Sequence, residues 1–144
     1  MVERIYHQEK LLSIIIRAEF EKDGIEFFTP DEFSQQVAYM KRPKGHAIDP
    51  HTHNPVTREV AFTKEVLFIR RGKVRVDFYD EKQNYLESRE LGTGDVILLA
   101  FGGHGIIMLE ESEIIEVKQG PYAGEMDKTR FCGVDETMVC VKKG

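Results

Sequence analysis

The chain has 144 residues, of which 41% are hydrophobic and 31% charged, and its formal net charge at pH 7 is −5. This composition is ordinary for a single globular domain, and the absence of a basic run argues against nucleic acid as a partner. No segment approaches the roughly 18 consecutive apolar residues of a membrane-spanning helix, so a membrane partner is not expected either.

The N-terminus and the cysteines indicate the compartment. The first residues lack the basic start and the apolar block of a secretory signal. Cys132 and Cys140 lie eight residues apart and have no CxxC partner. We therefore expect a cytoplasmic protein with two reduced thiols, and a disulfide across a late hairpin is the alternative.

Residues 29–42 predict a short amphipathic helix. The run Thr29–Glu32 combines a capping residue, a proline in the first helical position and a glutamate three residues after the cap. Apolar residues follow at helical spacing at Phe33, Val37 and Met40. The helix should end before Pro43, because proline and the residue before it resist helical geometry.

Short strands separated by turns are expected in the rest of the chain. The strand candidates are residues 11–16 with 18–20, 60–63, 65–69, 74–79, 96–101, 106–109, 114–118 and 138–141. Turns are expected at 81–84 and 92–94, and a tight hairpin at 70–73. This pattern predicts a mostly β protein, either a sandwich or a jelly-roll barrel. Residues 1–44 would pack on a barrel formed by residues 45–144, within one domain.

Alternation along two strands predicts which side chains face the interior. If Glu65 points inward, then Leu67 and Ile69 do too, and the apolar residues between them point outward. A strand that is apolar on both faces needs a second layer, from the N-terminal segment or from another copy, so we expect a homodimer. Arg75 and Asp77 should lie on the outer face of their strand, in solvent or at a subunit contact. The expected dry wall is Leu67, Ile69, Val76, Phe78, Leu98 and Met108.

Four side chains form a candidate metal site. His51 and His53 are separated by one residue, so on a strand they would project from the same face. With Glu65 and His104 they give three imidazoles and one carboxylate, a sufficient ligand set for a divalent transition metal. The two histidines could instead be hydrogen-bonded residues without a metal. Glu59, in the same loop, is an alternative to Glu65 as the carboxylate ligand.

The spacing of these residues resembles the cupin motifs. The first motif matches Gly45, His51, His53, Glu65 and Gly72, with its glutamate-to-glycine spacing intact and an enlarged loop before the glutamate. A looser second motif runs from Gly94 to His104, with alanine where proline is common and the histidine one residue early. The similarity covers about residues 45–118.

The resemblance implies a small jelly-roll barrel that holds the metal inside, bound by His51, His53, Glu65 and His104. Mixed imidazole and carboxylate ligands suit Fe(II), Mn(II), Ni(II), Co(II) or Zn(II), and the sequence does not choose among them. Four protein ligands leave two positions of a six-coordinate ion open, as in catalytic sites.

A second candidate feature is the loop after residue 118. Three cations, Lys118, Lys128 and Arg130, are candidates to bind a carboxylate or phosphate of a substrate. The alternative is a solvated loop whose charges have no binding role. Tyr122 is a further substrate-binding candidate. No residue is identified as a general base, and Glu59 and Tyr122 are guesses for that role. The loop resembles that of small cupins from sugar and surface-polysaccharide pathways.

These features lead to two hypotheses about function. The first is a metal-dependent enzyme, an isomerase, an epimerase or a dioxygenase, that acts on a sugar derivative or on a hydroxy or keto acid. The second is a non-catalytic module that binds or senses a small molecule, because one fold carries both uses. A dimerising domain with an empty site is a weaker third idea.

Overall fold

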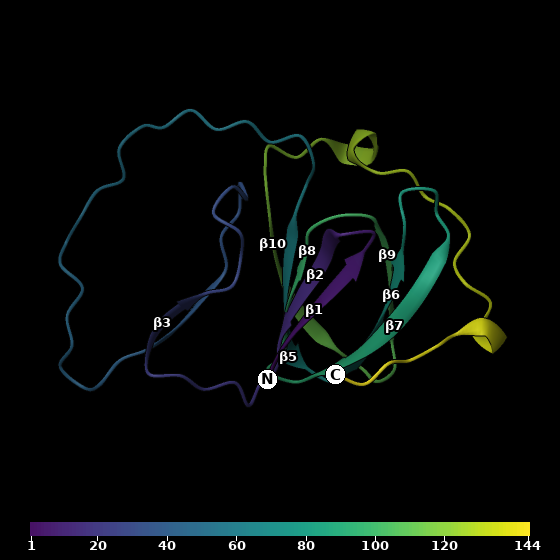
Figure 1. Ribbon diagram of the computed structural model, residues 1–144, viewed down its shortest axis with the longest axis horizontal. Coiled ribbons are helices and arrows are strands. Elements are labelled where there is room, and N and C mark those ends of the chain that lie inside the picture. The colour runs from purple at the N-terminus through teal and green to yellow at the C-terminus, as the bar shows by residue number, and fades with distance from the viewer. The chain divides into compact units, whose positions relative to one another are not determined.

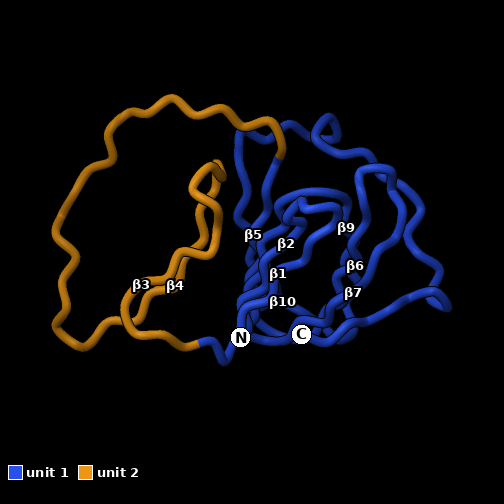
Figure 2. Tube along the Cα trace, in the orientation of Figure 1, with its two compact units in different colours: residues 1–20, 63–144 blue, residues 21–62 orange.

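The structure is a computed structural model that describes residues 1–144. Strands make up 42% of the chain and helical turns 5%, with no helix of seven residues or more, so the mostly β prediction is confirmed. The chain divides into two compact units, unit 1 with Met1–Phe20 and Thr63–Gly144, and unit 2 with Glu21–Phe62 (Figure 2). None of its helical turns has the length and apolar character needed to cross a membrane.

Unit 1 contains two antiparallel sheets (Figure 1). The larger sheet has the order β1 (Val2–His7), β2 (Lys10–Ile16), β8 (Val96–Leu99), β5 (Glu65–Arg71) and β10 (Glu113–Lys118). The smaller sheet has the order β7 (Tyr85–Gly92), β6 (Lys73–Tyr79) and β9 (Gly103–Met108). Two 3-10 turns, η1 (Gly124–Asp127) and η2 (Glu136–Met138), follow β10.

The core of unit 1 lies between these two sheets. Apolar side chains from both sheets form one cluster of buried residues: Ile5, Leu12, Ile15, Leu67, Ile69, Val74, Val76, Phe78, Leu91, Ile97 and Leu99. The sheets therefore pack face to face as an open sandwich, and neither closes into a barrel.

Of the six residues predicted to form the dry interior wall, four belong to this core and two do not. Leu67, Ile69, Val76 and Phe78 are buried members of the cluster, as predicted. Leu98 is buried but pairs with Ile14 and Val66, so it lies on the other face of the sheet, while its neighbours Ile97 and Leu99 face the core. A shift of one residue along a strand exchanges the faces. Met108, at the end of β9, is 52% exposed.

The alternation predicted for β5 is confirmed. Glu65, Leu67 and Ile69 are buried, whereas Phe68 remains 38% exposed. Phe68 pairs with Ile115 of β10, which is 49% exposed, so the outer face of these two strands is apolar. The homodimer stays a prediction.

The outer face of β6 is buried, whereas the sequence predicted that it would lie in solvent or at a subunit contact. Arg75 and Asp77 do point away from the core, but they are only 6% and 3% exposed. The Arg75 guanidinium donates to Asp77 Oδ1 at 2.8 Å and to both carboxylate oxygens of Glu136 at 2.8 Å. The C-terminal segment also makes backbone hydrogen bonds to Ser88 of β7, from Lys142 N and through Cys140 O. The C-terminal segment thus covers the ion pair of Arg75 and Asp77.

The two cysteines of the chain, Cys132 and Cys140, are free and exposed.

The predicted helix at residues 29–42 is wrong. Unit 2 contains a two-stranded hairpin of β3 (Gly24–Phe27) and β4 (Ala38–Lys41) instead. Thr29 does not cap a helix, because its hydroxyl accepts a hydrogen bond from Val37 N at 3.2 Å. The Gln36 amide donates to Pro30 O at 2.9 Å and to Phe33 O at 3.0 Å, which are carbonyls that a helix would use. A helix this short is marginal by itself, so local contacts decide the outcome.

The prediction of a tight hairpin at residues 70–73 is also wrong. Residues 70–73 form a turn but no hairpin, because β5 and β6 lie in different sheets. Gly72 has a φ of 87°, and a Cβ there would lie 2.3 Å from Glu111 O, so this position requires glycine. Residues 60–63 and 138–141 are not strands; Val141 forms only an isolated bridge to Ser88.

Candidate functional site

Glu65 and His104 meet at one end of the sandwich in unit 1. Glu65 is the first residue of β5, and His104 lies opposite Phe78 in the pairing of β9 with β6. His104 Nε2 is 3.1 Å from Glu65 Oε2. The Glu65 side chain is 10% exposed and that of His104 is 31% exposed, so the pair is accessible mainly through the imidazole. The structure thus brings together two of the four predicted site residues, which are 39 positions apart in the sequence.

The glycines before His104 explain how the chain reaches this position. Gly102 has a φ of 76°, and a Cβ there would lie 2.6 Å from Tyr79 O. A Cβ on Gly103 would lie 3.0 Å from the Phe131 ring. Larger residues would push the start of β9 away from β6, so the two glycines allow the pairing that sets the imidazole beside Glu65.

The electrostatics of the pair favour an ionised carboxylate. The hydrogen bond from His104 is the main cause that lowers the pKa of Glu65; burial opposes it, and the positive charges of His104, Lys128 and Lys118 add to it. An ionised carboxylate only accepts hydrogen bonds, so His104 Nε2 carries the proton in this arrangement. A cation that takes the place of this proton would release it to solvent, which makes cation binding pH-dependent.

Lys118 lies beside the same carboxylate. It pairs with Glu65 in the register of β10 with β5, and its Nζ is 3.9 Å from Glu65 Oε1. Its closest acceptor is Glu116 Oε1 at 2.9 Å. The sequence did not single out Glu116, although its position two residues before Lys118 on a strand places both on one face.

The loop after β10 is tied to the start of β5. Thr63 Oγ1 donates to Asp127 Oδ1 at 2.8 Å, and Lys64 N donates to Gln119 Oε1 at 2.6 Å. These two contacts hold η1 and the end of β10 near the first residue of β5. The loop is thus anchored at the end of unit 1 where Glu65 lies.

Three other candidate residues are exposed. Tyr122 is 88% exposed. Arg130 forms an exposed ion pair with Glu125, at 3.2 Å between Nη2 and Oε1. Glu59 is an exposed residue of unit 2. The structure thus gives neither Tyr122 nor Arg130 a contact with Glu65 or His104, and Lys118 is the member of the predicted substrate set that it brings to this carboxylate.

His51 and His53 belong to unit 2. Their segment is irregular and exposed, so the two side chains do not project from a strand. The two rings nevertheless lie close together, with centroids 5.3 Å apart and planes at 76°. His51 Nδ1 is 2.8 Å from Asp49 O, and since a carbonyl only accepts, Nδ1 donates in this contact and Nε2 takes no part in it. Metal-binding histidines commonly have this backbone contact.

Each of the two donor pairs has the kind of ligand atoms that transition metals bind. No group of three or more His, Cys, Asp or Glu side chains in the structure is arranged to hold an ion. Two ligand atoms about 2.1 Å from an ion, at a right angle, are about 3.0 Å apart, close to the 3.1 Å between His104 Nε2 and Glu65 Oε2. Two imidazoles on one ion have centroids at most about 6.4 Å apart, which the 5.3 Å between His51 and His53 satisfies.

Comparisons of the chain with protein-family models, with curated proteins and with solved structures found no match. The assignment of a family and of a function therefore depends on the motifs, contacts and charges described above.

Proposed function

We propose that the chain is a metal-dependent enzyme of the cupin type that acts on a small polar molecule, a sugar derivative or a hydroxy or keto acid. Its metal ligands are His51, His53, Glu65 and His104. The observation that carries this proposal is the 3.1 Å contact between His104 Nε2 and Glu65 Oε2, formed by strands of two opposing sheets. A carboxylate and an imidazole at this separation match neighbouring ligands of one transition-metal ion.

The path of the chain supports a jelly roll. From β5 onward the strands cross between the sheets: β5 is in the larger sheet, β6 and β7 in the smaller, β8 in the larger, β9 in the smaller and β10 in the larger. As a result β5 lies between β8 and β10, and β6 lies between β7 and β9. Repeated crossing between two antiparallel sheets is typical of jelly rolls.

The residues around Glu65 and His104 provide charge and exclude water. When bound, the metal acts as a Lewis acid that polarises a carbonyl or hydroxyl oxygen of the substrate. Glu65 would supply a negative charge to the metal, and His104 would hold it through Nε2. Leu99, opposite Glu65, and Phe78, opposite His104, are 4% and 1% exposed, so they exclude water behind the pair. Exclusion of water strengthens the electrostatic interactions of the site.

Metal analysis tests this proposal. Protein purified without an affinity tag, or titrated with Co(II) or Zn(II), should retain about one equivalent of metal after dialysis. The His51→Ala variant should lose most of it, whereas the matched control His46→Ala, in the same irregular segment, should not. Less than about a tenth of an equivalent in the unmodified protein, unrepaired by titration, contradicts the proposal.

The loaded protein is then incubated with sugar derivatives and with hydroxy and keto acids, and products are detected by mass spectrometry and NMR. Turnover that disappears in His51→Ala and persists in His46→Ala supports the enzyme. Tight binding without turnover of any compound in the panel contradicts the enzyme and favours a binding module.

A further inference from the structure

The edge of the larger sheet at β10 has no strand beside it. β10 is the last strand in the order of this sheet and pairs only with β5. In the smaller sheet, by contrast, the C-terminal segment covers the edge of β7, where Ser88 N donates to Cys140 O and Ser88 O accepts from Lys142 N. An edge without a partner presents N–H and C=O groups that can pair with a strand of another chain.

The hydrogen bonds of β5 show which backbone groups of β10 face this open edge. The N–H and C=O groups of Ile69 both bond with the turn before β8, so they point toward β8. Backbone groups alternate in direction along a strand, so those of Phe68 point the other way, toward its partner Ile115 on β10. By the same alternation, the backbone groups of Glu116 and Lys118 point away from β5, toward the open edge.

The outer face of the sheet is apolar next to this edge. Ile115 and Val117 of β10 are 49% and 57% exposed, and Phe68 of β5 is 38% exposed. The three side chains share one face, because Phe68 pairs with Ile115 and positions two apart on a strand point the same way. Exposed apolar side chains gathered beside an unpaired strand edge indicate an interaction surface.

The charged side chains of β10 make this edge complementary to itself. Glu116 and Lys118 flank Val117 on the other face, and Glu116 Oε1 is 2.9 Å from Lys118 Nζ. When a second β10 runs antiparallel with Val117 opposite Val117, Glu116 of each copy lies opposite Lys118 of the other. The four charges then alternate in sign around the axis, and the second copy adds no net charge. Every contact of a two-fold interface occurs twice, so a self-complementary edge favours a second copy over an unrelated strand.

We propose that β10 pairs with β10 of a second copy of this chain, antiparallel and with Val117 on the two-fold axis, so that the two larger sheets join into one. Glu116 and Lys118 of opposite copies exchange backbone hydrogen bonds, because both face the open edge, and their side chains form ion pairs. The two Val117 side chains meet on the outer face, as opposed residues of a pair without backbone hydrogen bonds lie close together. This pairing contains none of the proposed metal ligands, so it does not depend on the metal site.

The mass of the unmodified protein in solution tests the proposal. Sedimentation velocity over a range of micromolar concentrations should give twice the 16.6 kDa mass of the chain. Val117→Asp sets two like charges against each other on the axis and should weaken self-association by about 100-fold or more. Tyr6→Asp is the matched control and should leave the dimer unchanged, because Tyr6 is also 57% exposed and lies on β1, at the opposite edge of the same sheet.

Charge exchange tests the register of the two strands. Glu116→Lys and Lys118→Glu each leave charges of one sign around the axis, so each variant alone should be a monomer. When the two variants are mixed, every lysine at these positions faces a glutamate of the other chain. The mixture should therefore sediment as a dimer.

Each alternative result counts against the proposal. Unmodified protein that stays a monomer at every concentration overturns it. A dimer that Val117→Asp weakens no more than Tyr6→Asp does has its interface elsewhere, which also overturns it. A mixture of the two charge variants that stays monomeric overturns the pairing with Val117 on the axis.

Discussion

Replacing His104 with alanine should weaken the binding of Co(II) or Zn(II) by about 100-fold or more. Loss of a residue that merely supports a metal ligand costs 10- to 100-fold, so loss of a direct ligand should cost at least the upper value. The substitution removes the imidazole that lies 3.1 Å from Glu65 and leaves a carboxylate with a weaker metal site. Affinity is measured by competition with a chromophoric chelator at constant pH.

His7→Ala is the matched control, because it removes a histidine from β1 of the same unit and outside the proposed ligand set. Its metal affinity should equal that of the unmodified protein. Glu65→Gln, which keeps the shape of the side chain and removes its charge, should also weaken metal binding. Equal metal affinities for His104→Ala and His7→Ala would exclude His104 from the ligand set.

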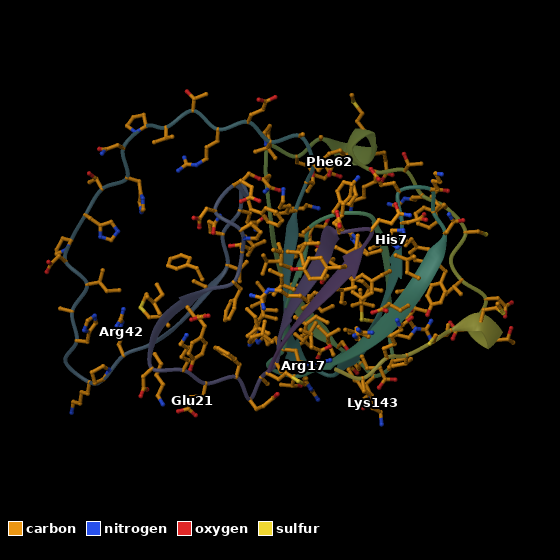
Figure 3. The ribbon with its side chains drawn as sticks, in the orientation of Figure 1. His7, Arg17, Glu21, Arg42, Phe62 and Lys143 are labelled. Carbon is orange, nitrogen blue, oxygen red and sulfur yellow. The ribbon has the colours of Figure 1, made fainter.

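Replacing Asp95 with alanine should lower the free energy of unfolding by about 3 kcal/mol, in the range for breaking one side of a buried ion pair. The Asp95 side chain is 9% exposed and pairs with Arg17 Nη1 at 2.9 Å. It also accepts hydrogen bonds from Ala18 N at 2.8 Å and Gly92 N at 2.9 Å. Arg17, labelled in Figure 3, follows β2, so Asp95 joins the end of that strand to the turn before β8.

The alanine variant leaves the guanidinium with one carboxylate partner fewer and two backbone N–H groups without their acceptor. Unfolding in urea, followed by circular dichroism, gives the change in free energy. Asp95→Asn keeps one acceptor oxygen and should lose less. Asp23→Ala removes a side chain that is 93% exposed and should stay within about 0.5 kcal/mol of the unmodified protein. An Asp95→Ala loss as small as that of Asp23→Ala would show that the ion pair does not hold this turn.

The strands that the sequence predicted well are those with apolar alternation and a covered inner face. For β5, burial of Glu65, Leu67 and Ile69 follows from the period of two residues. The strand β7 was missed because its sequence is rich in charge; Glu87 and Arg89 pair with each other at 2.6 Å. The helix expected after Thr29 failed because side-chain contacts of Gln36 replaced helical hydrogen bonds.

The sequence could predict which site residues on strands lie together, but it could not predict the course of the loops. Glu65 and His104 were chosen for one site because of their spacing in the sequence, and the structure places them 3.1 Å apart. The course of the loop after Lys118 is set by contacts such as that of Thr63 with Asp127, which no local pattern encodes. Lys118 reaches Glu65 because it is the last residue of β10 and lies opposite Glu65 in the strand register, whereas Arg130 belongs to the loop and pairs with Glu125 in solvent.

The most direct test of the metal site is a crystal structure of Co(II)-loaded protein, with anomalous data collected at the cobalt absorption edge. We predict one strong anomalous peak about 2.1 Å from His104 Nε2 and from a Glu65 carboxylate oxygen, with the imidazoles of His51 and His53 as further ligands. A cobalt peak with other ligands, and with the Glu65–His104 hydrogen bond intact beside it, would contradict the account.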